Sequence, residues 1–268
     1  MIDYIRFIED RLGIVGKDRQ SGPFVLNEIQ RKHLRDDFGN REIVLKARQM
    51  GFSSLFTAMF TADFILEPNS YSVIVADVED NAAGLLAKVK YYIQSYEDKT
   101  KQKVPLKYNS KNELHNAFMN TTFHIGTAKS VEFGRSRTIN NLLFSEFAFF
   151  PNIGNMIAGA GQAVTENGKF IIETTANGFN EFKEFWEESK KGLNNHKPLF
   201  YKASDFYDKK FLEKKKSELG DKFKQEYPET DIEAFLTSGE CYFNKEMLSK
   251  YLQTAKNPIK EGLVYAGV

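Results

Sequence analysis

The segment from Lys46 to Ser54 (KARQMGFSS) nearly matches a phosphate-binding loop. In the standard loop, GxxxxGK followed by Ser or Thr, backbone N–H groups surround phosphates, the lysine contacts them, and the hydroxyl binds magnesium. Here Gly51 and Ser53 keep their positions, whereas Phe52 occupies the lysine position and Lys46 the first glycine position. The segment therefore predicts a phosphate site that Lys46 enters from the opposite end of the loop. A lysine placed at position 52 is then expected to compensate for the loss of Lys46.

The residues on either side of this loop predict the elements that would hold it. Residues 42–47 (EIVLKA) form a short apolar run typical of a buried strand, and residues 52–66 have helical length with apolar residues along one face. The first N–H groups of that helix, and the positive end of its dipole, would then point at a bound anion. An ordinary strand-to-helix turn carrying a basic pair is the alternative interpretation of this segment alone.

Strands and helices continue to alternate after the loop. The further expected strands are residues 71–78, 122–126, 138–145 and 169–174, with a helix at 79–96 and small residues on helical spacing at 152–164. This alternation predicts a mainly parallel sheet covered by helices on both faces. In such sheets ligands bind at the carboxyl ends of the strands.

Composition and charge limit the possible classes of protein. A chain of 268 residues with 41% hydrophobic residues can bury a substantial core. One cysteine, Cys241, excludes an internal disulfide framework, and the four histidines show no metal-ligand spacing. No apolar run reaches membrane-spanning length. The net charge of +1 gives no global attraction to nucleic acid, so a DNA contact must come from a local patch. The run Lys214, Lys215 and Lys216 is such a patch, or a solvated helix face.

A second segment, residues 141–146 (NLLFSE), is an apolar strand that ends in a carboxylate. In the usual Walker B strand, an aspartate anchors magnesium and the next glutamate polarises the attacking water. Ser145 replaces the aspartate, and Glu146 keeps the glutamate position. A strand that merely ends in an exposed glutamate is the alternative.

Further motifs carry a resemblance to a known family. Residues 173–178 (ETTANG) resemble the coupling motif of viral large terminase subunits, the ATPases that pump DNA into capsids. Residues 24–30 (FVLNEIQ) resemble the adenine-recognition segment of that family, and 46–53 its deviant Walker A motif. Residues 226–228 (EYP) and 233–239 (EAFLTSG) resemble the signature that follows the ATPase core. In this order the motifs cover almost the whole chain, which therefore resembles a large terminase ATPase domain.

The resemblance implies a fold and a domain organisation. The implied class is α/β: a P-loop NTPase of the additional-strand, catalytic-glutamate class, with a mainly parallel sheet, helices on both faces and a small helical lid. Residues 1–205 would form the ATPase core and 206–256 the lid or linker. Residues 257–268 would be a linker and the first strand of a truncated nuclease domain.

The resemblance also implies a role for each candidate site residue. Glu146 would orient the attacking water, and Arg135 would be an arginine finger for a neighbouring subunit; a surface arginine without a role is the alternative, and Arg137 makes the choice ambiguous. Gln30 would recognise adenine, Ser53 would hold Mg²⁺, and Ser145 offers the metal only an uncharged hydroxyl. The phosphates would meet Lys46, Arg48, Gln49, Met50, Gly51, Phe52, Ser53 and Ser54. Coupling to movement would use Thr174, Thr175 and Asn177.

The implied cofactors are ATP and Mg²⁺, and the implied partners are double-stranded DNA, a portal protein and the small terminase subunit. The chain would be a monomer in isolation and a ring on the capsid, in the host cell cytoplasm and without membrane contact. Two rivals remain. A helicase-type DNA translocase should carry later arginine-bearing motifs, which the sequence lacks. A catalytically silent DNA-binding or assembly module is favoured by Phe52 and Ser145.

Overall fold

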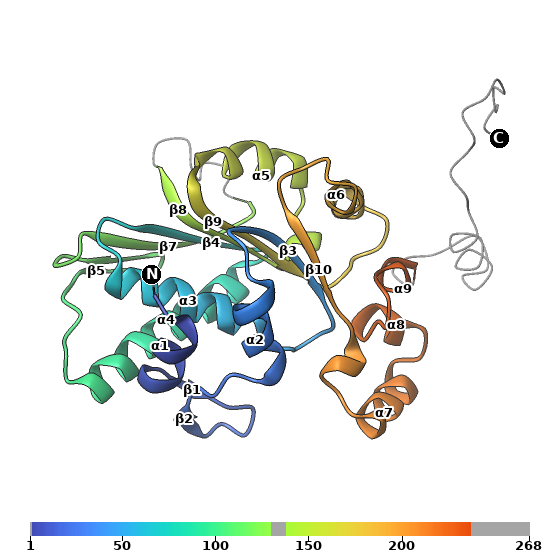
Figure 1. The fold of residues 1–268 in the computed structure, drawn as a ribbon, viewed down its shortest axis with the longest axis horizontal. Coiled ribbons are helices and arrows are strands. Elements are labelled where there is room, and N and C mark those ends of the chain that lie inside the picture. The colour runs from blue at the N-terminus through green and yellow to red at the C-terminus, as the bar shows by residue number, and fades with distance from the viewer. Residues whose placement is uncertain (1, 130–137, 237–268) are drawn as a thin grey trace.

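The computed structural model describes residues 2–129 and 138–236, and its centre is a mainly parallel sheet (Figure 1). The strands of this sheet lie in the order β10-β3-β9-β8-β4-β7-β6-β5. All neighbours from β10 to β7 are parallel, and β6 and β5 extend the sheet as an antiparallel edge. The strand bounds are β3 (Arg41–Lys46), β4 (Tyr71–Ala76), β5 (Leu106–Asn109), β6 (Glu113–Asn116), β7 (Thr121–Thr127), β8 (Ile139–Ser145), β9 (Val164–Thr174) and β10 (Lys197–Tyr201).

Helices cover both faces of the sheet (Figure 1). On one face lie α1 (Tyr4–Arg11), α2 (Glu28–Lys32) with the π-helical turn that continues it (His33–Asp37), α3 (Phe52–Leu66) and α4 (Glu79–Thr100). On the other face lie α5 (Ile153–Gly159) and α6 (Glu181–Lys190). Alternate strand residues point to opposite faces, so Val44 and Leu143 join one core cluster, whereas Ile43 and Leu142 join the other.

The chain then continues into short helices beside the carboxyl ends of the strands: α7 (Lys209–Leu219), α8 (Phe223–Glu226) and α9 (Asp231–Leu236). Helix α9 is attached to α6, because Trp186 Nε1 donates a hydrogen bond to Asp231 (3.0 Å) and Phe235 is buried near Phe182. Helix α7 has no fully buried residue. A small hairpin of β1 (Gly13–Val15) and β2 (Ser21–Pro23) packs beside α4.

The sheet confirms the predicted α/β class with helices on both faces. Helix α3 has the predicted bounds, and β3 and β4 match within two residues. Two predicted lengths were wrong: α4 runs to Thr100, and β9 begins at Val164. The hairpins β1–β2 and β5–β6 and the strand β10 were not predicted. No helix of the described part is long and apolar enough to span a membrane. The residues predicted as the family signature beyond 236 and as the nuclease strand lie outside the described residues.

Candidate nucleotide-binding site

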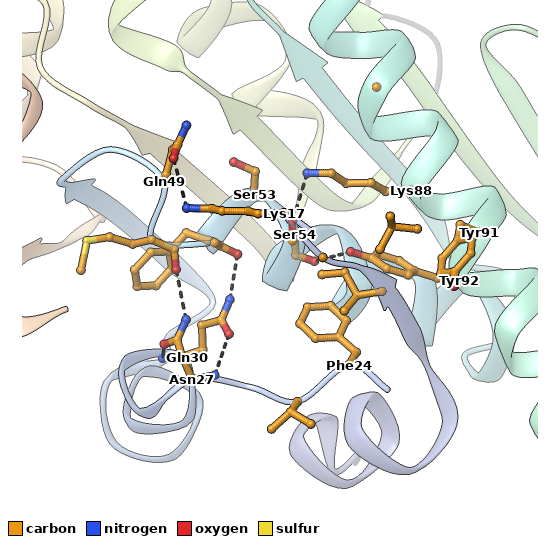
Figure 2. Close-up of a pocket in the computed structure, with 18 of the residues that line it drawn as sticks. Lys17, Phe24, Asn27, Gln30, Gln49, Ser53, Ser54, Lys88, Tyr91 and Tyr92 are labelled. Atoms are coloured by element: carbon orange, nitrogen blue, oxygen red, sulfur yellow. Dashed lines mark hydrogen bonds between the residues drawn. The ribbon is translucent and has the colours of Figure 1, made fainter. Parts of the chain in front are cut away.

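The predicted phosphate loop connects β3 to α3 at the carboxyl edge of the sheet. It borders a cavity of about 870 Å³ that also reaches α2, α4 and the β1–β2 hairpin (Figure 2). A second cavity of about 480 Å³ shares the loop residues Arg48 and Ser53 and extends to Glu146 and Thr175. The loop and the ends of β8 and β9 therefore face one continuous hollow, where ligands of parallel sheets bind.

The loop takes a conformation suited to exposing backbone N–H groups. Gln49 has φ 61° and Gly51 has φ 85°, both left-handed. A Cβ on Gly51 would also lie 2.7 Å from Gln30 Nε2, so glycine is required there for two reasons. Helix α3 then begins at Phe52, so its first N–H groups have no partner within the helix. This geometry leaves them free for an anion.

Two loop residues can offer a phosphate only their backbone. The side chains of Met50 and Phe52 are fully buried, and the Phe52 ring lies 4.7 Å from that of Tyr201. The expectation that a lysine at position 52 compensates for the loss of Lys46 is therefore wrong on physical grounds, because that lysine would bury an unpaired charge in an aromatic core.

Lys46 lies between two carboxylates at the end of β3. Its side chain is only 4% exposed, and Nζ lies 3.0 Å from Glu173 Oε2 and 3.5 Å from Glu146 Oε1. Burial alone would lower the pKa of this ammonium, but the carboxylates of Glu146 and Glu173 outweigh burial and raise the pKa above its usual range. Lys46 is thus a fixed cation at the strand ends, as the upstream-lysine interpretation requires.

Glu173 is a site residue that the sequence reasoning missed, since it was considered only as the first residue of the coupling motif. Its side chain is fully buried, and Oε1 accepts hydrogen bonds from Ser145 Oγ (2.6 Å) and Ser53 Oγ (2.7 Å). Burial opposes ionisation of this carboxyl, yet Lys46 and the two serines together lower its pKa. The available signal was that residues 170–173 (FIIE) form a second apolar run ending in glutamate.

Glu146 follows β8 in a left-handed conformation with φ 58°. This conformation is costly for a residue other than glycine, and such strain is often found at functional sites. Its backbone N–H donates to the Glu173 carbonyl (2.8 Å), and its Oε2 accepts weakly from Thr175 N (3.4 Å). Burial, opposed by Lys46 and assisted by Glu173, raises the pKa of the Glu146 carboxyl. The side chain remains 30% exposed, so a water molecule can reach it.

The predicted coupling residues hold the turn that follows Glu146. Thr174 Oγ1 accepts from Ala148 N (3.1 Å), and Asn177 Nδ2 donates to the Ala148 carbonyl (3.2 Å). Only Thr175, through its backbone, contacts the Glu146 carboxylate. These contacts link the end of β9 to the carboxylate predicted to act on water, whereas sensing of a γ-phosphate by Thr175 and Asn177 stays a prediction.

Gln30 lines the larger cavity, but its amide is already engaged. Oε1 accepts from Asn27 N (3.0 Å) in a capping box, and Nε2 donates to the Gly51 carbonyl (2.8 Å) (Figure 2). In this state the residue connects α2 to the phosphate loop. Its contact with adenine stays a prediction that needs a change of partners.

Arg48 connects the loop to the C-terminal helices. Its guanidinium Nη1 lies 2.9 Å from Glu226 Oε2, and its carbonyl accepts from Tyr207 Oη (2.7 Å). The guanidinium is 57% exposed and borders both cavities. A lysine that the sequence reasoning did not consider, Lys88 of α4, donates to Ser54 Oγ at 3.0 Å (Figure 2). The predicted finger Arg135 lies outside the described residues.

The oxygen atoms at the strand ends fit a magnesium ion. Mg²⁺ prefers hard oxygen ligands, usually one or two carboxylates together with water and substrate phosphates. Ser53 and Ser145 supply hydroxyls and Glu173 a carboxylate, whose Oε2 is buried without a well-aligned hydrogen bond. In the described part of the chain, no three His, Cys, Asp or Glu side chains gather around a point that could hold a metal. Phosphate and water would therefore complete the shell.

Comparison with solved structures identifies the fold. The large terminase ATPase domain of Thermus phage P74-26 matches with a TM-score of 0.59 and 17% identity, over 75% of this chain and 92% of that one. The large terminase of bacteriophage HK97 matches with a TM-score of 0.64 and 15% identity, over 81% of this chain and 51% of that one. A thermophilic-phage large terminase in complex with ATP-gamma-S matches at 0.52 and 11%, over 71% and 49%.

No protein-family model matches the sequence, and no curated protein sequence matches it. The structural matches are too distant in sequence to establish more than a shared architecture. They nevertheless define the class: this chain has the fold of phage large terminase ATPase domains, which is a P-loop NTPase fold. It spans about half the length of the HK97 large terminase.

Proposed function

We propose that this chain is the ATPase domain of a viral large terminase and hydrolyses ATP to drive double-stranded DNA into a capsid. One observation carries the proposal: Lys46, Ser53 and Glu146 come from three separate elements and meet at the cavity beside the loop. The distant relative solved with ATP-gamma-S supports the choice of nucleotide.

The residues divide the work of an in-line attack by water on the γ-phosphate. Lys46 and Arg48 neutralise phosphate oxygens, and the N–H groups of residues 49–54 surround them. Glu146, which is raised in pKa and open to solvent on one side, orients the water and accepts its proton. A Mg²⁺ bound with the nucleotide would withdraw charge from the phosphates, and Ser53 is the hydroxyl placed to hold it.

The finer assignments belong to the same proposal. Residues 1–205 act as the ATPase core and residues from 206 onwards as a lid, which Arg48–Glu226 connects to the loop. Arg135 serves a neighbouring subunit in a ring, and a portal protein and the small subunit are partners in the host cytoplasm. The exposed lysines of α7 offer a local patch for DNA, since phosphate contacts need accessible cations.

The test is nucleotide affinity measured over a magnesium titration, followed by ATP turnover. We expect ATP-γ-S to bind more tightly with Mg²⁺ than with EDTA, and ATP to be hydrolysed when subunits assemble. A chain that binds no nucleotide under either condition would contradict the proposal. Binding without any effect of Mg²⁺ would favour the catalytically silent module instead.

A further inference from the structure

The strand β8 lacks a charge where a magnesium anchor usually stands. Position 145 holds a serine, which is 4% exposed and ends the strand directly before Glu146. An uncharged hydroxyl interacts with a divalent cation far more weakly than a carboxylate does. If the chain uses Mg²⁺ with ATP, the missing negative charge must come from another residue.

The neighbouring strand supplies a carboxylate at the same level of the sheet. Ser145 of β8 pairs in register with Glu173 of β9. Parallel neighbours lie about 4.8 Å apart, and paired residues point to the same face. Glu173 Oε1 in fact lies 2.6 Å from Ser145 Oγ, so a carboxylate oxygen is within hydrogen-bond distance of the position 145 side chain. The acid has moved sideways by one strand, and the longer glutamate side chain makes up the distance.

The same oxygen also contacts the hydroxyl expected to bind magnesium. Ser53 Oγ lies 2.7 Å from Glu173 Oε1. Adjacent oxygen ligands of an octahedral Mg²⁺, each about 2.1 Å from the ion, lie about 2.9 Å apart. The separation in the protein is therefore close to that of two neighbouring ligands, or of one ligand and the carboxylate that orients it.

Charge balance gives a separate reason for a cation at this place. Glu173 is fully buried, and its only cationic partner is Lys46 at 3.0 Å, within the part of the chain that the structure describes. If Lys46 turns to the phosphates, Glu173 keeps two hydroxyl groups but loses its positive partner. An unpaired buried carboxylate is strongly unfavourable, and a divalent cation beside Ser53 would replace the lost charge.

We propose that Glu173 is the carboxylate that anchors the nucleotide-bound Mg²⁺, replacing the acid missing at position 145 and acting with the Ser53 hydroxyl. This inference rests on the proposed nucleotide site. It also gives Lys46 two partners in sequence: Glu173 before nucleotide binds, and the phosphates afterwards. Ser145 then has the role of orienting the Glu173 carboxylate through its hydrogen bond.

The experiment compares the affinity for ATP-γ-S in Mg²⁺ with that in EDTA, for wild type and variants. We expect Glu173→Gln to reduce the gain from Mg²⁺ by about 10- to 100-fold, the effect typical of losing a group that supports a metal ligand. Affinity in EDTA should stay within a few-fold of wild type. The double variant Ser145→Asp, Glu173→Ser returns the acid to β8 and should recover the gain.

A matched control is Glu42→Gln. Glu42 is also fully buried, and it pairs with His33 (3.0 Å) near the start of β3, away from the strand ends that form the cavity. This variant makes the same chemical change at a buried carboxylate, so it should lower stability without altering the ratio of the two affinities. The comparison separates a metal role from general damage to the core.

A folded Glu173→Gln variant that keeps the wild-type ratio would overturn the inference. If that variant does not fold, the double variant decides: a gain from Mg²⁺ supports the inference and its absence overturns it. If neither folds, Fe²⁺ in place of Mg²⁺ on the wild type should direct peroxide cleavage beside residue 173, and no cut there overturns it. Wild type that binds no nucleotide contradicts the proposed function itself.

Discussion

Two groups of charges in this molecule have similar distances but opposite surroundings. At the strand ends, Lys46 lies 3.0 Å from Glu173, and both side chains are almost completely buried. On α7, Lys215 lies 2.6 Å from Glu218, with side chains 31% and 42% exposed. Exposed pairs contribute about 0–1 kcal/mol, whereas breaking a buried pair costs about 3–5 kcal/mol. Burial, rather than distance, therefore distinguishes the charges that the fold pays to keep.

The buried cluster is also the one that touches the proposed site. A cluster that only stabilised the fold could be replaced by apolar side chains of similar size. Here the cluster opens onto a cavity through Glu146 and Ser53, and α7 has no comparable opening in the described structure. The expected effects of mutation follow the same division, from the largest to the smallest.

The largest expected effect tests whether the cluster is complete. It holds one buried lysine, so further transition-state charge must come from elsewhere, and we expect Arg135 of a neighbouring subunit to supply it. An arginine finger contributes about 10³- to 10⁵-fold to other phosphoryl transfers. The rate per subunit should therefore rise with protein concentration or with assembly on a portal, and Arg135→Ala should abolish that rise.

Mixed subunits identify the direction of the contribution. When Arg135→Ala subunits are mixed with Glu146→Gln subunits, activity should return at interfaces that combine an intact Glu146 with an intact Arg135. A rate that is already high at dilution and unaffected by Arg135→Ala would show that no trans finger exists.

The next effect concerns Glu146. Glu146→Gln should lower ATP turnover by about 10²- to 10⁴-fold, because the amide keeps the shape but cannot accept a proton from water. Binding of ATP should stay within a few-fold of wild type. The measurement is single-turnover hydrolysis together with binding of ATP-γ-S; near-normal turnover would remove Glu146 from the mechanism.

Lys46→Ala tests the cation of the buried cluster. It should weaken ATP binding or turnover strongly and also lower stability, because Glu173 and Glu146 lose their shared partner. Lys169→Ala is a matched control: it removes a lysine 3.0 Å from the buried Asp63, outside the cavity. Both variants should unfold at lower denaturant concentration, but only Lys46→Ala should lose nucleotide. Normal hydrolysis by Lys46→Ala would contradict the upstream-lysine interpretation.

The smallest effect concerns the exposed pair of Arg48 and Glu226. Glu226→Gln should change the free energy of unfolding by no more than about 1 kcal/mol. It should also release Arg48 toward the phosphates and tighten ATP-γ-S binding by about twofold, the factor that corresponds to about 0.5 kcal/mol. Glu218→Gln on α7 is the control and should leave affinity unchanged. Weaker binding by Glu226→Gln would instead show that this pair holds the loop in its active shape.

The sequence predicted the buried part of the fold well and the edges poorly. The apolar runs of β3, β4 and β8 permit few structures other than a buried strand, so their positions were correct. Strand β10 was missed because it is short, lies at the edge of the sheet and contains Pro198, which edge strands tolerate. The polar first half of β9 gave no apolar signal, so the strand seemed to begin later.

The candidate site was predictable only where one motif contained the answer. Gly51 and Ser53 follow from loop chemistry, and the left-handed glycine was found where the pattern required it. The position of Glu173 depends on β9 lying between β3 and β8, and strand order is set by long-range packing that local patterns do not encode. The serine at 145 and the extra glutamate at 173 become one feature only after these strands are placed side by side.

The most direct test is a crystal structure of the chain with ATP-γ-S and Mg²⁺. We predict the nucleotide in the cavity beside the loop, with phosphate oxygens within hydrogen-bond distance of Lys46 Nζ and of the N–H groups of residues 50–54. Glu146 should face the γ-phosphate through a water molecule. A nucleotide bound elsewhere, or Lys46 still held between Glu146 and Glu173 with no phosphate contact, would contradict the proposed ATPase site.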